Sequence, residues 1–229
     1  MDGTLVDTEP YWMRAETELV ESFGGTWTHD DGLLLVGSGL LGSAAILQGR
    51  GVALEARAIV DRLTDRVQEQ LSTAGVPWRP GALELLTDLH AAGIPMALVT
   101  MSEQRMARQI SALVGFDAFA TIVAGDMVQQ SKPHPEAYLT AADILGVDPE
   151  HCVAIEDSIP GVAAAVASGA VAIAVPHMIS LPDSDEYTLW STLADTSVAT
   201  VSALYQSRRA APTDYPTPTI TTSKDAARS

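Results

Sequence analysis

Short apolar runs alternate with amphipathic segments along most of the chain. The runs have the length of buried parallel strands, and they cover residues 96–100, 121–124, 152–155 and 171–175. Around them, apolar residues recur at helical spacing over 81–92, 104–114, 135–145 and 159–168, and each of these segments ends beside a glycine. Strands that alternate with helices form right-handed βαβ units, so the pattern predicts an α/β fold with a doubly wound parallel sheet.

The segment 11–76 has a different pattern. It contains no convincing buried strand, and its apolar residues follow helical spacing instead. One helical face carries Ala15, Leu19 and Phe23, and another carries Val60, Leu63, Val67 and Leu71. The pattern predicts a helical module inserted near the start of the α/β core. We expect Trp12, Trp27 and Trp78 to belong to the core of this module.

The expected domain organisation is therefore discontinuous. Residues 1–10 and 77–206 form the α/β core, and residues 11–76 form the helical insert. Residues 207–229 are rich in Thr, Pro, Ala and Ser and have few apolar anchors. This composition predicts a disordered tail.

Composition and charge narrow the class of protein. The chain has 229 residues, a formal net charge of −16 and a sequence pI near 4.4. Nucleic-acid binding needs a basic surface, so this balance argues against it. Cys152 is the single cysteine of the sequence, which excludes an internal disulfide and agrees with a reducing compartment. We therefore expect a cytoplasmic protein.

Two stretches resemble motifs of other protein classes without meeting their requirements. Residues 158–182 carry no charge, but glycines and prolines interrupt them. A helix that ends at a glycine and is followed by a buried strand therefore explains this stretch better than a membrane span does. Gly37, Ser38 and Gly39 do not follow a strand, so they are not a dinucleotide-binding fingerprint. We expect them to shape a loop of the insert, and we expect no membrane partner.

Polar side chains follow the predicted strands at the point where each strand ends. Thr100 ends the first run, Lys132 lies in the loop after the second, and Glu156 and Asp157 end the third. Ligands of parallel α/β sheets bind outside the carboxyl ends of the strands, so these side chains are expected to meet at one rim. A hydroxyl, an ammonium group and several carboxylates are the groups that phosphoryl transfer through an aspartyl phosphate requires.

The opening residues resemble the first motif of the haloacid dehalogenase superfamily of phosphotransferases. Met1-Asp2-Gly3-Thr4-Leu5-Val6-Asp7 matches Asp-x-Asp-Gly-Thr-Leu-x-Asp from its second position onward. Three further stretches are similar to the β-phosphoglucomutase/phosphoglycolate phosphatase branch: residues 79–86, 131–138 and 155–162. The resemblance implies a Rossmann-like sheet with a helical cap, which matches the predicted insert. It also implies a nucleophilic aspartate directly before Met1, so the resemblance leads us to expect a chain truncated within its first strand.

The resemblance assigns roles to individual residues of the core. Asp2 matches the general acid/base, and Thr100 and Lys132 match the hydroxyl and the lysine that hold the phosphate oxygens during catalysis. Met101 and Ser102 adjoin Thr100 in the same substrate-binding loop. Taken singly, each motif has an ordinary structural explanation, such as a solvated loop charge for Lys132. The occurrence of all of them in order favours the family.

A magnesium ion is the expected cofactor. The resemblance implies that Asp2, through its backbone carbonyl, and the acidic pair Glu156 and Asp157 hold Mg²⁺. Hard oxygen ligands are those that this ion prefers, and the cation would screen an anionic nucleophile from an anionic phosphate.

The leading functional hypothesis is a Mg²⁺-dependent phosphatase of small phosphorylated metabolites, with sugar phosphates as candidate substrates. A phosphomutase uses the same chemistry and stays open as an alternative, as does a binding protein that has lost catalysis. A dehalogenase fits less well, because Asp2-Gly3-Thr4 and the acidic pair suit phosphate chemistry. A response-regulator receiver also places Asp, Thr and Lys around Mg²⁺, but the helical insert and the chain length count against it.

Overall fold

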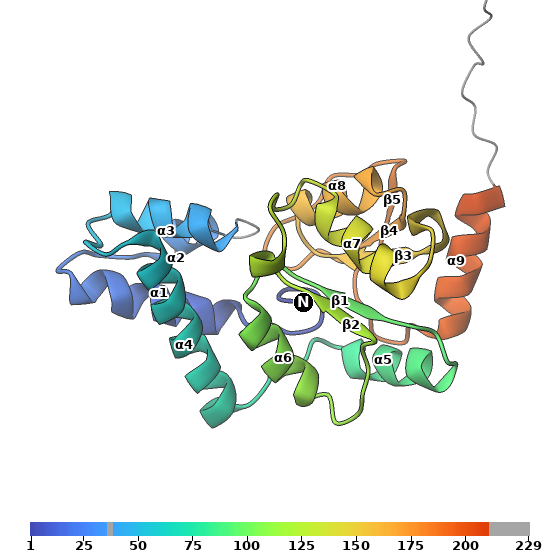
Figure 1. Ribbon diagram of the computed structural model, residues 1–229, viewed down its shortest axis with the longest axis horizontal. Helices are drawn as coiled ribbons and strands as arrows, with labels where there is room; N and C mark the ends of the chain where they lie inside the picture. Colours follow the sequence, from blue (N-terminus) through green and yellow to red (C-terminus); the bar gives the residue numbers. More distant parts are fainter. Residues whose placement is uncertain (36–38, 211–229) are drawn as a thin grey trace, which may run out of the picture.

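The chain begins with a group of four helices. The structure is a computed structural model that describes residues 1–35 and 39–210, so Gly37 and Ser38 lie outside the described residues. The helices are α1 (Glu9–Ser22), α2 (His29–Leu33), α3 (Leu40–Gly49) and α4 (Ala56–Ala74). They lie together on one side of the molecule, away from the strands (Figure 1). The inserted segment is therefore helical, as its pattern predicts.

An apolar stripe on α4 builds the core of this helical group. Val60, Leu63, Val67 and Leu71 are all buried, and α4 packs against both α1 and α3. The prediction for Phe23 is wrong, because α1 ends at Ser22 and the side chain of Phe23 is 37% exposed.

The strands of the core run parallel to one another. They are β1 (Ala97–Val99), β2 (Thr121–Val123), β3 (Val153–Glu156), β4 (Val171–Ala174) and β5 (Tyr187–Leu189). β1 pairs with β2, and β3 pairs with β4, which pairs in turn with β5. All four apolar runs that predict strands are therefore confirmed, while β5 is an additional strand at the edge.

Helices cover both faces of the strands. They are α5 (Ala82–Ala91), α6 (Gln104–Ala112), α7 (Glu136–Leu145), α8 (Ile159–Ala167) and α9 (Val198–Ala210). Strand β3 shows how the two layers share the core, since alternate side chains of a strand point to opposite faces. Ala154 belongs to a cluster with Val162 of α8, whereas Ile155 packs against a cluster with Ala82 of α5 and Val201 of α9. This arrangement confirms the doubly wound α/β fold.

A gap in the sheet separates β1 from β3. The described strands form two sheets, β1–β2 and β3–β4–β5. A cavity of about 530 Å³ between them is lined by residues of β1 and β3, by α5, α7 and α9, and by Met1 and Leu5. We call this cavity the central slot. In the described chain each of the two strands has an edge toward the slot that no other strand pairs with.

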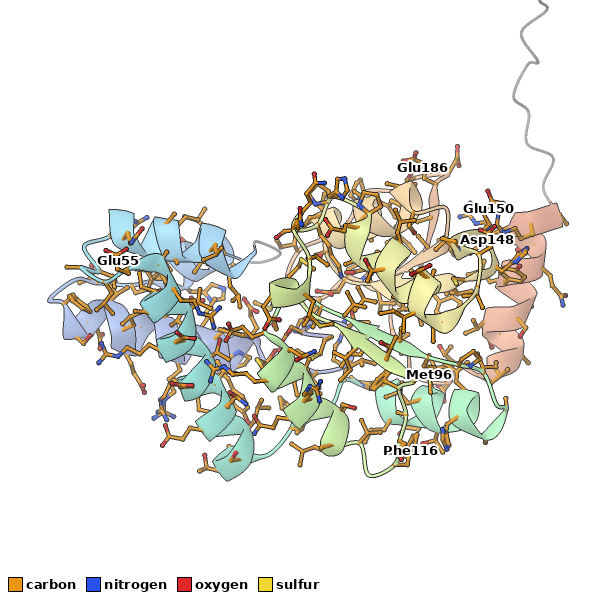
Figure 2. The ribbon with its side chains drawn as sticks, in the orientation of Figure 1. Glu55, Met96, Phe116, Asp148, Glu150 and Glu186 are labelled. Atoms are coloured by element: carbon orange, nitrogen blue, oxygen red, sulfur yellow. The ribbon has the colours of Figure 1, made fainter. Side chains whose placement is uncertain are left out.

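The end of the described chain is helical. α9 continues to Ala210, so residues 207–210 belong to a helix rather than to the expected tail, and residues 211–229 lie outside the described residues. Arg209 ties α9 to the sheet, because its guanidinium lies 3.6 Å from the Glu150 carboxylate and donates to the Gly169 carbonyl at 3.0 Å. Figure 2 shows Glu150 beside this helix. No helix in the described ranges is long and apolar enough to span a membrane.

Candidate active site

A small cavity lies where the helical group meets the carboxyl ends of the strands. Its volume is about 140 Å³. All seven predicted site residues line it: Asp2, Thr100, Met101, Ser102, Lys132, Glu156 and Asp157. These residues come from the N-terminal segment, the loop after β1, the loop after β2 and the end of β3. The structure therefore brings together every site residue that the sequence predicts.

Hydroxyl groups from two sides hold the Asp2 carboxylate. Ser102 Oγ donates to Asp2 Oδ2 at 2.7 Å, and Thr100 Oγ1 lies 3.5 Å from the same oxygen. On the other side, Thr8 Oγ1 donates to Asp2 Oδ1 at 2.5 Å, and Trp12 Nε1 donates to it at 3.5 Å. Both carboxylate oxygens are thus positioned, Oδ2 by the loop after β1 and Oδ1 by Thr8, the N-cap of α1, and by Trp12 of α1.

Gly3 allows Asp157 to approach the backbone beside Asp2. The backbone of Gly3 has a φ of +71°, and a Cβ atom there would lie 2.0 Å from Asp157 Oδ2. Only glycine meets both conditions without strain. Asp157 Oδ1 accepts a hydrogen bond of 2.8 Å from Thr4 Oγ1, so the first motif and the acidic pair are in direct contact.

Asp157 lies in a strained electrostatic environment. Burial raises the pKa of Asp157 to about 6, and the negative charge of Glu156 adds to this effect. A carboxylate with this environment would gain from a nearby cation, because the cation would offset both the lost solvation and the repulsion.

Lys132 and Glu156 form a buried ion pair. Their side chains are 7% and 6% exposed, and the Lys132 ammonium contacts Glu156 Oε1, which also accepts from the Tyr138 hydroxyl. Burial would raise the pKa of Glu156, but the charge and hydrogen bonds of Lys132 outweigh it and hold this pKa below its ordinary value. The other oxygen, Oε2, accepts from the Asp157 backbone N–H at 3.3 Å. Both oxygens of Glu156 are therefore engaged by the protein itself, which suits an anchor for Lys132.

The donors available for a metal are few. No group of three His, Cys, Asp or Glu side chains in the described chain is arranged to hold a metal ion. Among the predicted ligands, Glu156 is bonded to Lys132 and Tyr138, and the side chain of Asp2 is bonded to hydroxyl groups. Asp157 is the predicted ligand whose carboxylate has the smallest number of protein partners. Its oxygen chemistry, with the Asp2 carbonyl, suits a hard cation.

Several residues that sequence reasoning missed support the site. Thr8 and Tyr138 bond to Asp2 and Glu156, and the Arg79 guanidinium contacts the Gly3 carbonyl and donates to the Val175 carbonyl at 3.2 Å. Trp12 is buried in the core of the insert, as expected, but it also reaches Asp2. The contacts of Tyr138 and Arg79 join segments that lie 18 and 76 residues apart, whereas Thr8 and Trp12 lie 6 and 10 residues from Asp2. Arg79 and Tyr138 belong to the family-like stretches 79–86 and 131–138, but the spacing of these stretches does not show which groups the two side chains contact.

Two carboxyl groups of α1, the half-buried Glu9 and the buried Glu16, line the cavity. Burial and the neighbouring charges of Glu16, Asp2, Asp157 and Asp7 raise the pKa of Glu9 to about 8. Burial raises the pKa of Glu16 to about 7, although a hydrogen bond from Trp27 lowers it in part. These two glutamates were not among the predicted site residues.

The Glu16 carboxyl is expected to make the fold less stable as pH rises. Its pKa is about 7 in the fold against 4.5 ordinarily, so the folded chain holds the proton more tightly, and stability falls between these pH values. The gap corresponds to roughly 3 kcal/mol at most. Glu16→Gln should therefore raise the melting temperature at pH 8 by several degrees and change it little at pH 4.5. Thermal melting at both pH values checks this, and an equal change at both would contradict it.

Comparisons with known proteins agree with this geometry. A family model described as haloacid dehalogenase-like hydrolase matches residues 1–169. Hexitol phosphatase A of Escherichia coli is 34% identical over 82% of this chain and 86% of its own length. The phosphorylated carbohydrates phosphatase of Thermotoga maritima is also 34% identical, over 74% of this chain and 79% of its own.

A solved structure shows the same arrangement of elements. The crystal structure of CbbY from Rhodobacter sphaeroides in complex with phosphate has a TM-score of 0.78 and 28% sequence identity to this chain. The match covers 88% of this chain and 96% of that one. The fold, the rim of motif residues and these likenesses lead to one conclusion: the chain belongs to the haloacid dehalogenase-like hydrolase family.

Proposed function

We propose that this protein is a Mg²⁺-dependent phosphatase that hydrolyses phosphate monoesters of small metabolites through an aspartyl phosphate. One observation carries the proposal above the others. Asp2, Thr100, Ser102, Lys132 and Asp157 come from separate segments and line one cavity at the carboxyl ends of the strands. This set supplies an acid/base group, phosphate-binding donors and a cation ligand, which are the groups that phosphoryl transfer needs.

The described residues have distinct roles in this proposal. Thr100, Ser102 and the Lys132 ammonium hold phosphate oxygens, and Glu156 keeps the ammonium in place. Asp2 protonates the leaving alcohol and then activates water for hydrolysis of the intermediate. The proposal requires one more carboxylate, the nucleophile, on an aspartate directly before Met1. We use the term strand-completed chain for a variant with about four apolar residues and an aspartate placed there, a length that fits a short parallel strand.

Asp157 and the backbone carbonyl of Asp2 would hold Mg²⁺ in this proposal, and Glu156 contributes through Lys132 instead of as a ligand. The bound cation would supply charge screening between the nucleophile and the phosphate. Asp157 depends on such a partner most, because burial and Glu156 already disfavour its charged form.

The substrate class is supported by the named relatives. A hexitol phosphatase matches 82% of this chain, and a phosphatase of phosphorylated carbohydrates matches 74% of it. We therefore propose a sugar or polyol phosphate as the substrate. Residues 11–76 would act as a cap over a core of residues 1–10 and 77–206, and the single cysteine suits a cytoplasmic enzyme.

The proposal is tested by measuring products. We expect the strand-completed chain to release inorganic phosphate from hexose and hexitol phosphates in Mg²⁺, and to do so without forming an isomeric sugar phosphate. Incubation with β-glucose 1-phosphate separates the two chemistries. Accumulation of glucose 6-phosphate without free phosphate would contradict a phosphatase and favour a phosphomutase.

Asp2→Asn is expected to slow hydrolysis by the strand-completed chain roughly a hundredfold or more, the usual scale of general acid/base catalysis. Its hydrogen bonds to Ser102 and Thr8 place it at the reacting centre. Hydrolysis of esters with leaving groups of low pKa should slow by a smaller factor, because these leaving groups need less protonation. Turnover of an alkyl phosphate and of p-nitrophenyl phosphate gives this comparison, and equal losses for both would show that Asp2 is not the acid.

A further inference from the structure

We propose that Glu16, held by the indole of Trp27, binds a hydroxyl group of the substrate at the insert side of the cavity. The preferred substrates would then be phosphate esters that carry further hydroxyl groups a few atoms from the phosphorus. This inference rests on the proposed function and adds a residue that selects the substrate.

The face of α1 leads from the reacting centre to Glu16. Glu9, Trp12 and Glu16 all line the cavity, and their spacing of three and then four residues places them on one side of the helix. Trp12 touches Asp2 through its indole N–H. Glu16 lies about 6 Å further along the helix axis, since each residue advances the helix by about 1.5 Å. A phosphate bound beside Asp2 would therefore direct a short carbon chain toward Glu16.

The Glu16 carboxyl is buried but keeps hydrogen-bonding capacity. Glu16 is 5% exposed, and Trp27, which is 8% exposed, donates to its Oε2 at 3.1 Å. Among the described residues, Oε1 has no hydrogen-bond partner, although Glu16 lines the cavity. Oε1 is not among the fully buried polar atoms of the described residues, so a water molecule or a substrate hydroxyl can reach it from the cavity. A substrate hydroxyl can bond to this oxygen whether or not the carboxyl holds its proton.

The surroundings of Glu16 suit a carbon chain with hydroxyl groups. Ser43 of α3 is 5% exposed and lines the same cavity, so it offers a second hydroxyl-binding group. Leu35, Leu40 and Leu63 line the remaining wall and would contact the hydrocarbon part.

Binding measurements test the inference without requiring turnover. The 229-residue chain and its Glu16→Leu variant are titrated calorimetrically with glucitol 6-phosphate and with n-butyl phosphate, in Mg²⁺. We expect Glu16→Leu to weaken the binding of glucitol 6-phosphate at least tenfold, which is the scale of a hydrogen bond to a charged group. The affinity for n-butyl phosphate should change less than twofold, because that ester has no further hydroxyl group that Glu16 could bind. Trp27→Phe should weaken glucitol 6-phosphate by a smaller factor.

Matched controls separate the role of Glu16 from stability. Glu21→Leu changes an exposed glutamate of the same helix and should affect neither ester. Glu16→Gln keeps a hydrogen-bonding group and should retain more affinity than Glu16→Leu, and thermal melting confirms that each variant folds. Equal losses for both esters, or no loss for glucitol 6-phosphate, would overturn the inference. The same titrations are run on the strand-completed chain with asparagine in place of the added aspartate. If neither ester nor inorganic phosphate binds that chain, the proposed function itself fails and this inference fails with it.

Discussion

An apolar strand that ends in aspartate, placed directly before Met1, is expected to raise the melting temperature strongly and to permit Mg²⁺-dependent hydrolysis of acetyl phosphate. The physical reason is the central slot, a cavity of about 530 Å³ between β1 and β3. Both strands have an edge toward it without a described partner. A parallel strand there would pair with both edges and fill the space between the helix layers.

The expected gain in stability is large. About four buried apolar side chains at ~1.5–3 kcal/mol each would contribute roughly 6–12 kcal/mol. This is comparable with the whole stability of a typical domain, about 5–15 kcal/mol. The added aspartate would stand directly before Met1, which lines both the slot and the site cavity.

Two controls isolate the strand from the carboxylate. The same strand ending in asparagine should raise the melting temperature equally but give no hydrolysis. A strand of polar residues ending in aspartate should do neither. Equal melting temperature and equal activity with and without the apolar strand would show that the slot does not take a strand and that another residue is the nucleophile.

Asp157→Ala in the strand-completed chain should abolish Mg²⁺-dependent hydrolysis of acetyl phosphate, with a loss of at least roughly a thousandfold, because a catalytic cation supplies several kcal/mol. Asp157 lies against Gly3, beside Asp2, the proposed acid/base, and burial with the charge of Glu156 raises the pKa of Asp157 to about 6. Removing it would leave the nucleophile and the phosphate facing each other with too few ligands for the ion.

The neighbouring glutamate provides a matched comparison. Glu156 accepts hydrogen bonds from Lys132 and Tyr138, so Glu156→Gln should lower the rate through a misplaced ammonium group. The Mg²⁺ concentration for half-maximal rate should rise in Asp157→Asn and stay nearly unchanged in Glu156→Gln. A titration of rate against Mg²⁺ measures both. A larger change for Glu156→Gln would contradict the assignment and favour Glu156 as the principal ligand.

The sequence predicts the core elements well where a regular pattern dictates them. Runs such as 171–175 are apolar throughout because helices cover both faces of the strand, and β4 is buried at every position. β5 escapes prediction because Tyr187–Leu189 is short, contains Thr188 and follows a stretch rich in Asp and Pro. The prediction for Phe23 is wrong for a related reason. The spacing of apolar residues indicates one face of a helix, but it does not show that α1 ends at Ser22.

The site shows the same limit. Its seven predicted residues lie at strand ends or in recognisable motifs, so the sequence can place them at one rim. The partners of those residues could not be predicted, because they depend on packing between the insert and the core. Arg79 reaches Gly3 across 76 residues, and Glu16 lines a cavity whose other walls come from the loops after β1 and β2.

The most direct test of the central claim is to trap the phosphorylated enzyme. The strand-completed chain is mixed with acetyl phosphate and Mg²⁺, quenched in acid and digested, and the phosphorylated peptide is located by mass spectrometry. We predict a phosphoryl group on the aspartate before Met1, with greater accumulation in Asp2→Asn because hydrolysis of the intermediate needs that base. Rapid turnover with no labelled peptide in either form, or a label on Asp2 or Asp157, would contradict phosphoryl transfer through that aspartate at this rim.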